Sequence, residues 1–158
     1  MTFFGRTPAA SPEFTPPATV QSIAVLGAGS WGTAFAKIVA DAARERGEDR
    51  AGRQVQDLRE AVAHVGRIDA VKQGDDTRVT LIGRDEQVMA ECERSRENAR
   101  YFPGMKLPDN MHFTADAPAA LTGADIVVLA LPAQVLRSQL QSFARYIEPN
   151  AMLVSLAK

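Results

Sequence analysis

Three glycines in the first quarter of the chain have the spacing of a turn that binds phosphate. Gly27, Gly29 and Gly32 stand in the sequence G-A-G-S-W-G, directly after the apolar run Ile23–Leu26. In a strand–turn–helix unit, the first glycine permits the turn and the second lets the backbone approach the phosphates. The third lets helix and strand pack closely, and the helix N-terminus attracts the anion. The pattern predicts a pyrophosphate site for a dinucleotide; the alternative is a glycine-rich turn that binds nothing.

A basic residue, Arg84, follows the next predicted strand. Strictly NAD-binding proteins often place Asp or Glu here to hold the ribose hydroxyls, whereas a basic residue can meet a 2′-phosphate. Arg84 therefore favours tolerance of NADP, although it could be a solvated arginine at a helix start. Asp85 leaves the choice between NAD and NADP open, because it could pair with Arg84 or cap the following helix.

The elements that would position these residues alternate between strand and helix. Short apolar runs are separated by segments with the apolar spacing of helices. This order predicts a doubly wound α/β domain with a mostly parallel sheet, of the Rossmann dinucleotide-binding type. The loops after its strands should then share one crevice with the glycine turn. The expected strands are 23–26, 78–83, 112–114, 126–131 and 152–156, and the expected helices include 31–46, 86–98 and those that begin near 116 and 132.

Apolar spacing also predicts which faces of the first and last of these helices are buried. The first helix should bury Phe35, Ile38, Val39 and Ala42, and the last should bury Val135, Leu136, Leu140 and Phe143.

The predicted domain covers residues 21–158. Residues 1–20 are rich in Pro, Ala, Ser and Thr, and we expect a disordered extension. Residues 47–77 are expected to be an insertion, because a dinucleotide-binding unit usually reaches its second strand after about 30 residues. Within this insertion, 53–65 has the spacing of an amphipathic helix.

Composition narrows the class of partner. The 158 residues allow one domain with a hydrophobic core, and a net charge of −1 gives no sign of binding to nucleic acid or to a membrane. Cys92 is the only cysteine, and His64 and His112 lie far apart, so the sequence offers neither a disulfide nor a metal site. Without a signal peptide or a run of about 20 apolar residues, a cytoplasmic location is expected.

Six motifs together resemble the bacterial NAD(P)-dependent glycerol-3-phosphate dehydrogenases, in that family's order. They cover nearly everything from Ile23 onward except the expected insertion. Any one of them alone would be unspecific, but six in register are specific. The motifs are G-A-G-S-W-G-T-A at 27–34, G-R-D at 83–85, R-E-N-A-R-Y-F-P-G at 96–104, L-P-D-N at 107–110, A-D-I-V-V-L-A-L-P-A-Q at 124–134 and L-V-S-L-A-K at 153–158.

The resemblance implies an oxidoreductase that interconverts sn-glycerol 3-phosphate and dihydroxyacetone phosphate with NAD or NADP, for phospholipid synthesis. In that family a helical substrate domain follows and supplies the catalytic lysine. We therefore expect an N-terminal cofactor domain that has no catalytic residue of its own and is inactive alone. Whether the full-length enzyme forms a homodimer is left open by the sequence. The alternative is a non-catalytic module that binds or senses NAD(P)(H), and the downstream sequence would discriminate between the two.

The resemblance also implies roles for individual residues. Ser30 and Trp31 would line the cofactor phosphates, although Trp31 could instead be a core or hinge aromatic. Tyr101 would lie near the cofactor, or else pack beneath the turn at 103–104. Lys158 would touch both cofactor and substrate, because a cation at a strand end can attract a phosphate. Without the motif, Lys158 would be read as an exposed terminal lysine.

Overall fold

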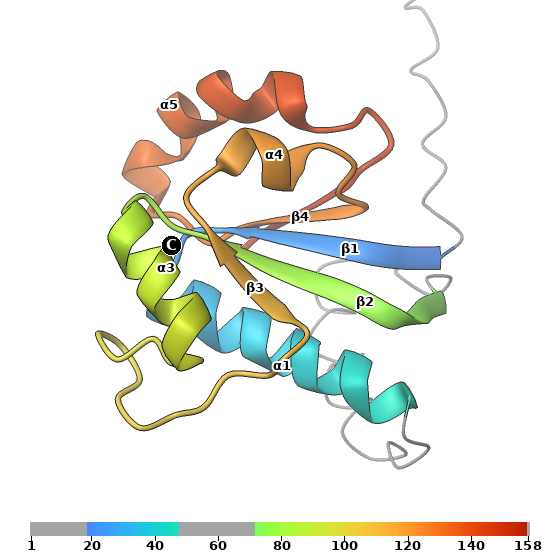
Figure 1. The fold of residues 1–158 in the computed structure, drawn as a ribbon. Coiled ribbons are helices and arrows are strands. Elements are labelled where there is room, and N and C mark those ends of the chain that lie inside the picture. The colour runs from blue at the N-terminus through green and yellow to red at the C-terminus, as the bar shows by residue number, and fades with distance from the viewer. Residues whose placement is uncertain (1–18, 48–71, 158) are drawn as a thin grey trace, which may run out of the picture.

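A five-stranded parallel sheet forms the centre of the computed structural model, which describes residues 19–47 and 72–157 (Figure 1). The strand order is β3-β2-β1-β4-β5, and each neighbouring pair runs parallel. This arrangement confirms the predicted doubly wound α/β fold. The strands are β1 (Thr19–Leu26), β2 (Lys72–Ile82), β3 (Met111–Thr114), β4 (Ile126–Leu129) and β5 (Met152–Ser155).

Helices cover both faces of the sheet (Figure 1). α1 (Ser30–Gly47) and α3 (Glu86–Ser95) lie on one face, and α4 (Ala117–Leu121) and α5 (Ala133–Phe143) on the other. A short 3-10 helix, η1 (Ala144–Tyr146), follows α5. Within the described residues, no helix combines the length and the apolar character needed to cross a bilayer.

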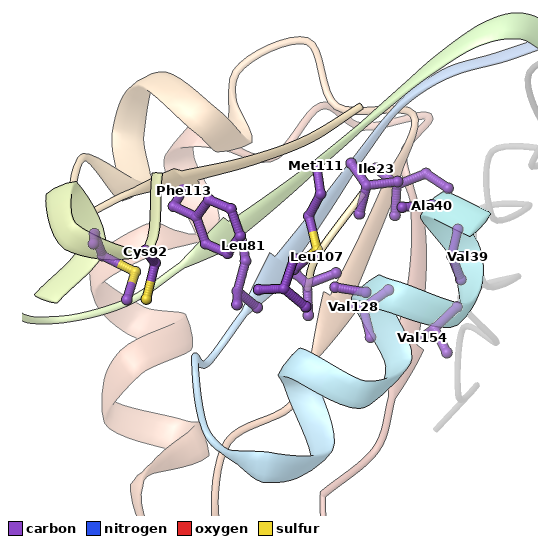
Figure 2. Packing of buried hydrophobic residues seen from close by; sticks show 14 of the residues in the cluster. Ile23, Val39, Ala40, Leu81, Cys92, Leu107, Met111, Phe113, Val128 and Val154 are labelled. Carbon is purple, nitrogen blue, oxygen red and sulfur yellow. The ribbon is translucent and has the colours of Figure 1, made fainter. Parts of the chain in front are cut away.

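The larger core cluster lies between the sheet and the α1/α3 layer. Successive strand residues point to opposite faces, so alternate residues of each strand enter this cluster. Leu81 and Met111 are fully buried in it, and Val39 packs from α1 (Figure 2). Burying an aliphatic side chain of this size contributes about 1.5–3 kcal/mol, so these contacts fix α1 against the sheet.

The predicted buried face of α1 is confirmed at Val39 and Ala42, and Phe35 is partly buried against the core, but the prediction is wrong at Ile38. Ala36, Val39 and Ala40 are buried, whereas Ile38 is 54% exposed. Ile38 lies two residues after Ala36 and two before Ala40, so it is on the opposite side of the helix from the residues that face the sheet. In α5 Val135 is 41% exposed, so the predicted inner face is also wrong at this position. The other predicted residues of that face, Leu136, Leu140 and Phe143, are partly buried against the second core cluster.

Both of the first two strands begin earlier than predicted. β1 starts at Thr19, inside the expected 1–20 extension, and Val20 is fully buried. β2 starts at Lys72, inside the expected 47–77 insertion, and its first half includes the polar sequence Q-G-D-D. The Thr77 hydroxyl donates to the Val20 carbonyl at 3.0 Å and joins the two strands where their register shifts. The rest of the extension, the predicted helix 53–65 and Lys158 lie outside the described residues.

Cys92 provides a direct test of this core. It is 3% exposed, and burial, followed by the charge of Glu91, raises the pKa of its thiol above the ordinary value. Because the thiolate is the reactive form, we expect the native chain to react slowly at neutral pH with a water-soluble disulfide reagent. The same chain should react rapidly in denaturant. Rapid stoichiometric labelling of the native chain would contradict this packing.

Candidate cofactor site

The carboxyl ends of all five strands form one row at one edge of the sheet. Leu26 pairs with Ile82 on one side and with Leu129 on the other. Those two residues pair in turn with Thr114 and Ser155. The loops that follow the strands therefore start from a common line, as the sequence predicted. Ligands of open parallel sheets bind along this edge.

The three glycines of the turn have different surroundings. Gly27 has φ +119°, and a Cβ built on it would lie 2.5 Å from the carbonyl oxygen of Ala130. A Cβ on Gly32 would lie 1.9 Å from the carbonyl oxygen of Gly27. Around the corresponding position on Gly29 nothing lies within 4 Å. Gly27 and Gly32 are thus required by backbone conformation and packing, whereas Gly29 leaves the open approach that a phosphate needs.

α1 begins inside this turn and presents its N-terminus there. The Thr33 amide donates to the Gly29 carbonyl at 2.9 Å, which starts the helical hydrogen bonding. The first turn of a helix directs N–H groups and the positive end of the helix dipole outward, so an anion is favoured at this position. Ser30 and Trp31 are exposed here, Trp31 by 62%. This exposure rules out the core position that Trp31 could have taken and is compatible with its predicted role.

A loop between α3 and β3 contacts the glycine turn through one buried side chain. Asn98 is 1% exposed, and its Nδ2 donates to Thr33 Oγ1 at 2.9 Å and to the Ala28 carbonyl at 3.3 Å. Asn98 is not among the site residues predicted from the sequence. The available signal was its place in the motif R-E-N-A-R-Y-F-P-G.

Arg96 shapes the base of the same loop. It ends α3 with φ +53°, so that helix is shorter than the predicted 86–98. Its guanidinium donates to the carbonyls of Pro108 and Met111 and lies 5.2 Å from the centre of the Phe113 ring. It also pairs with Glu93 at 3.4 Å. These contacts fix where β3 begins and hold the two ends of the loop together.

Arg84 is exposed and lies two residues after the end of β2. Asp85 caps α3, because its Oδ1 accepts from the Val88 amide at 3.1 Å. This answers the question that the sequence left open for Asp85. Within residues 19–47 and 72–157 Arg84 forms no ion pair. Its contact with a 2′-phosphate stays a prediction.

Tyr101 lies in the loop that carries Asn98 and is 42% exposed. The guanidinium of Arg100 lies 5.7 Å from the centre of its ring. The exposure disfavours the alternative in which Tyr101 packs beneath a turn. Its predicted place beside the cofactor stays a prediction, as does the role of Lys158, which lies outside the described residues.

A cavity of about 460 Å³ opens beside this edge, between α3 and the end of β3. Glu86, Glu93 and Asp116 line it together with apolar side chains such as Met89 and Phe113. None of the predicted site residues lines this cavity. Its acidic rim would repel a phosphate, so the cavity is not an extension of the glycine-turn site.

Comparison with known proteins adds to this geometry. The sequence model of a family described as NAD-dependent glycerol-3-phosphate dehydrogenase N-terminus matches residues 22–158. The chain belongs to this family. The matched residues contain the whole glycine turn and the loop that carries Asn98.

Curated relatives agree with this assignment, and a solved structure shares the fold. The chain is 38% identical over 135 residues to the glycerol-3-phosphate dehydrogenase [NAD(P)+] of Streptomyces griseus, and 36% identical over 136 residues to that of Corynebacterium urealyticum. These matches cover 85% and 86% of this chain but only 30% and 31% of the relatives. The glycerol-3-phosphate dehydrogenase structure of Plasmodium falciparum shares the fold, with a TM-score of 0.63 at 23% identity, covering 86% of this chain and 32% of that one.

The surroundings of the glycines predict that two alanine variants differ in stability. Gly32→Ala places a methyl group against the Gly27 carbonyl and should lower the free energy of unfolding by about 1–3 kcal/mol. Gly29→Ala adds its methyl group in open space and should change that free energy by less than about 0.5 kcal/mol. Urea unfolding of both variants measures the difference. Equal stability of the two would contradict the close contact of α1 with β1.

Proposed function

We propose that this chain binds the pyrophosphate of NADH or NADPH at its glycine turn, as the cofactor domain of a glycerol-3-phosphate dehydrogenase. The observation that carries the proposal is the open backbone at Gly29, between two glycines held in close contact and at the N-terminus of α1. Membership of the dehydrogenase family supports it. The names of the curated relatives, which specify NAD(P)+, support both cofactors.

The whole enzyme would interconvert sn-glycerol 3-phosphate and dihydroxyacetone phosphate. A bound nicotinamide supplies or accepts the hydride. In this chain the N–H groups at the start of α1 would hold the pyrophosphate, and Ser30 and Trp31 would flank it. Arg84 would neutralise a 2′-phosphate, Tyr101 would lie beside the cofactor, and Lys158 would reach both cofactor and substrate. The remaining two thirds of the relatives' length would supply the catalytic lysine and most contacts to the substrate.

The cellular setting belongs to the same proposal. A cytoplasmic location suits an enzyme whose substrate and cofactor are both small and soluble. Glycerol 3-phosphate would then be available for phospholipid synthesis. The assembly proposed for the full-length protein is a homodimer, and a measurement of its mass in solution tests this.

Direct binding is the first test, and Trp31 is a built-in probe because it is the only tryptophan in the chain. Titration with NADPH and with NADH should quench its emission saturably for at least one of them, since reduced nicotinamide absorbs in that range. Gly29→Ala should weaken this binding at least about tenfold, because its methyl group occupies the approach of the phosphate. No measurable binding of either dinucleotide would overturn the proposal.

Arg84→Ala tests the preference between the two cofactors. Removing a cation that meets the 2′-phosphate should weaken the binding of NADPH about tenfold and the binding of NADH much less. Arg94→Ala is the matched control, because it removes the same charge from an exposed pair with Glu91 on α3. Equal losses of affinity for NADPH and NADH in Arg84→Ala would show that Arg84 does not contact the 2′-phosphate.

A further inference from the structure

We propose that Asn98 is a positioning residue that holds the glycine turn in the conformation that binds the cofactor. The inference rests on the proposed function of the turn. Asn98 itself would not touch the dinucleotide. It would act by fixing the backbone that does.

The two acceptors of Asn98 bracket the phosphate-facing segment. The Nδ2 of its amide donates both to the carbonyl of Ala28, just before Gly29, and to the hydroxyl of Thr33, just after Gly32. A single planar amide therefore joins both ends of the segment 29–32. With the distances to both ends fixed, the N–H groups between them keep a constant direction. A preorganised turn binds more tightly because less ordering is needed on binding.

Burial makes this tether costly to remove. Asn98 is 1% exposed and Thr33 is fully buried. Without the amide, the Thr33 hydroxyl would lose its donor in a place that water does not readily reach. A buried polar group left without a partner favours a shifted conformation that restores one. The shift would occur in the turn, where the predicted ligand binds.

Asn98 can act as a tether because its own backbone is held firmly. Its carbonyl accepts from the amides of Tyr101 and Phe102, at 3.1 and 2.9 Å. The loop is also tied across itself, where the Glu97 carboxylate accepts from the Gly104 amide at 2.7 Å. The loop is therefore a rigid support for the glycine turn, and the contact joins two of the motifs on which the family resemblance rests.

The same loop offers a matched control. Asn110 Nδ2 donates to the Ala40 carbonyl at 2.8 Å, so it too is an amide that ties this loop to α1. Ala40 lies well along the helix, away from the glycine turn. Both contacts stabilise the packing of the loop on α1, but only the contact of Asn98 lies at the predicted phosphate site.

The experiment compares Asn98→Ala with Asn110→Ala in this chain. Asn98→Ala should weaken binding of NADPH or NADH, whichever the parent chain binds more tightly, about tenfold. Asn110→Ala should change it by less than about twofold. The isosteric Thr33→Val removes only the 2.9 Å contact and should weaken binding about threefold. If Asn98→Ala does not fold, the binding measured for Thr33→Val tests the proposed role of Asn98 in its place.

Hydrogen exchange without cofactor gives an independent readout. The Thr33 amide, which donates to the Gly29 carbonyl, should exchange faster in Asn98→Ala and in Thr33→Val than in the parent chain, and should be unchanged in Asn110→Ala. Unchanged exchange of this amide in Asn98→Ala and Thr33→Val, or equal weakening of binding by the Asn98 and Asn110 variants, would overturn the tether. Failure of the parent chain to bind either dinucleotide would instead refute the proposed function, and exchange would still test the tether.

Discussion

The site depends on one close contact between two backbones. The Cα of Gly32 lies so near the Gly27 carbonyl that any side chain there would overlap it. This contact places the first turn of α1 directly over the end of β1. The alanines that follow, including Ala36 and Ala40, continue the close packing along the helix. As a result, the N-terminus of α1 points at the row formed by the strand ends.

The loop after β4 fits against the same contact. A Cβ on Gly27 would meet the carbonyl oxygen of Ala130, and one on Gly32 would lie 3.1 Å from the Ala130 side chain. The turn is therefore held from three directions: by β1 and α1 themselves, by the loop after β4, and by Asn98 from the loop before β3. Its open side is at Gly29. Rigid support on the closed sides is what a preorganised anion site requires.

Local patterns predicted much of this arrangement. Glycine spacing, apolar runs and their alternation identified the parallel sheet and the edge at which its strands end. They also identified the close packing at Gly27 and Gly32, whereas the phosphate contact at Gly29 stays a prediction. The same patterns failed where polar residues begin a strand, as at Lys72, and at Ile38, which lies on the opposite side of α1 from the residues that face the sheet. Asn98 was missed for a different reason. It lies 65 residues from Thr33, and no local period reports a contact over that separation.

The most direct test of the account is the map of backbone amide chemical shifts in the isotope-labelled chain as NADPH or NADH is added. We expect the largest shifts at Gly29, Ser30 and Trp31, at the start of α1. Shifts confined to the cavity between α3 and β3, lined by Glu93 and Asp116, would contradict this expectation, as would no shifts at all.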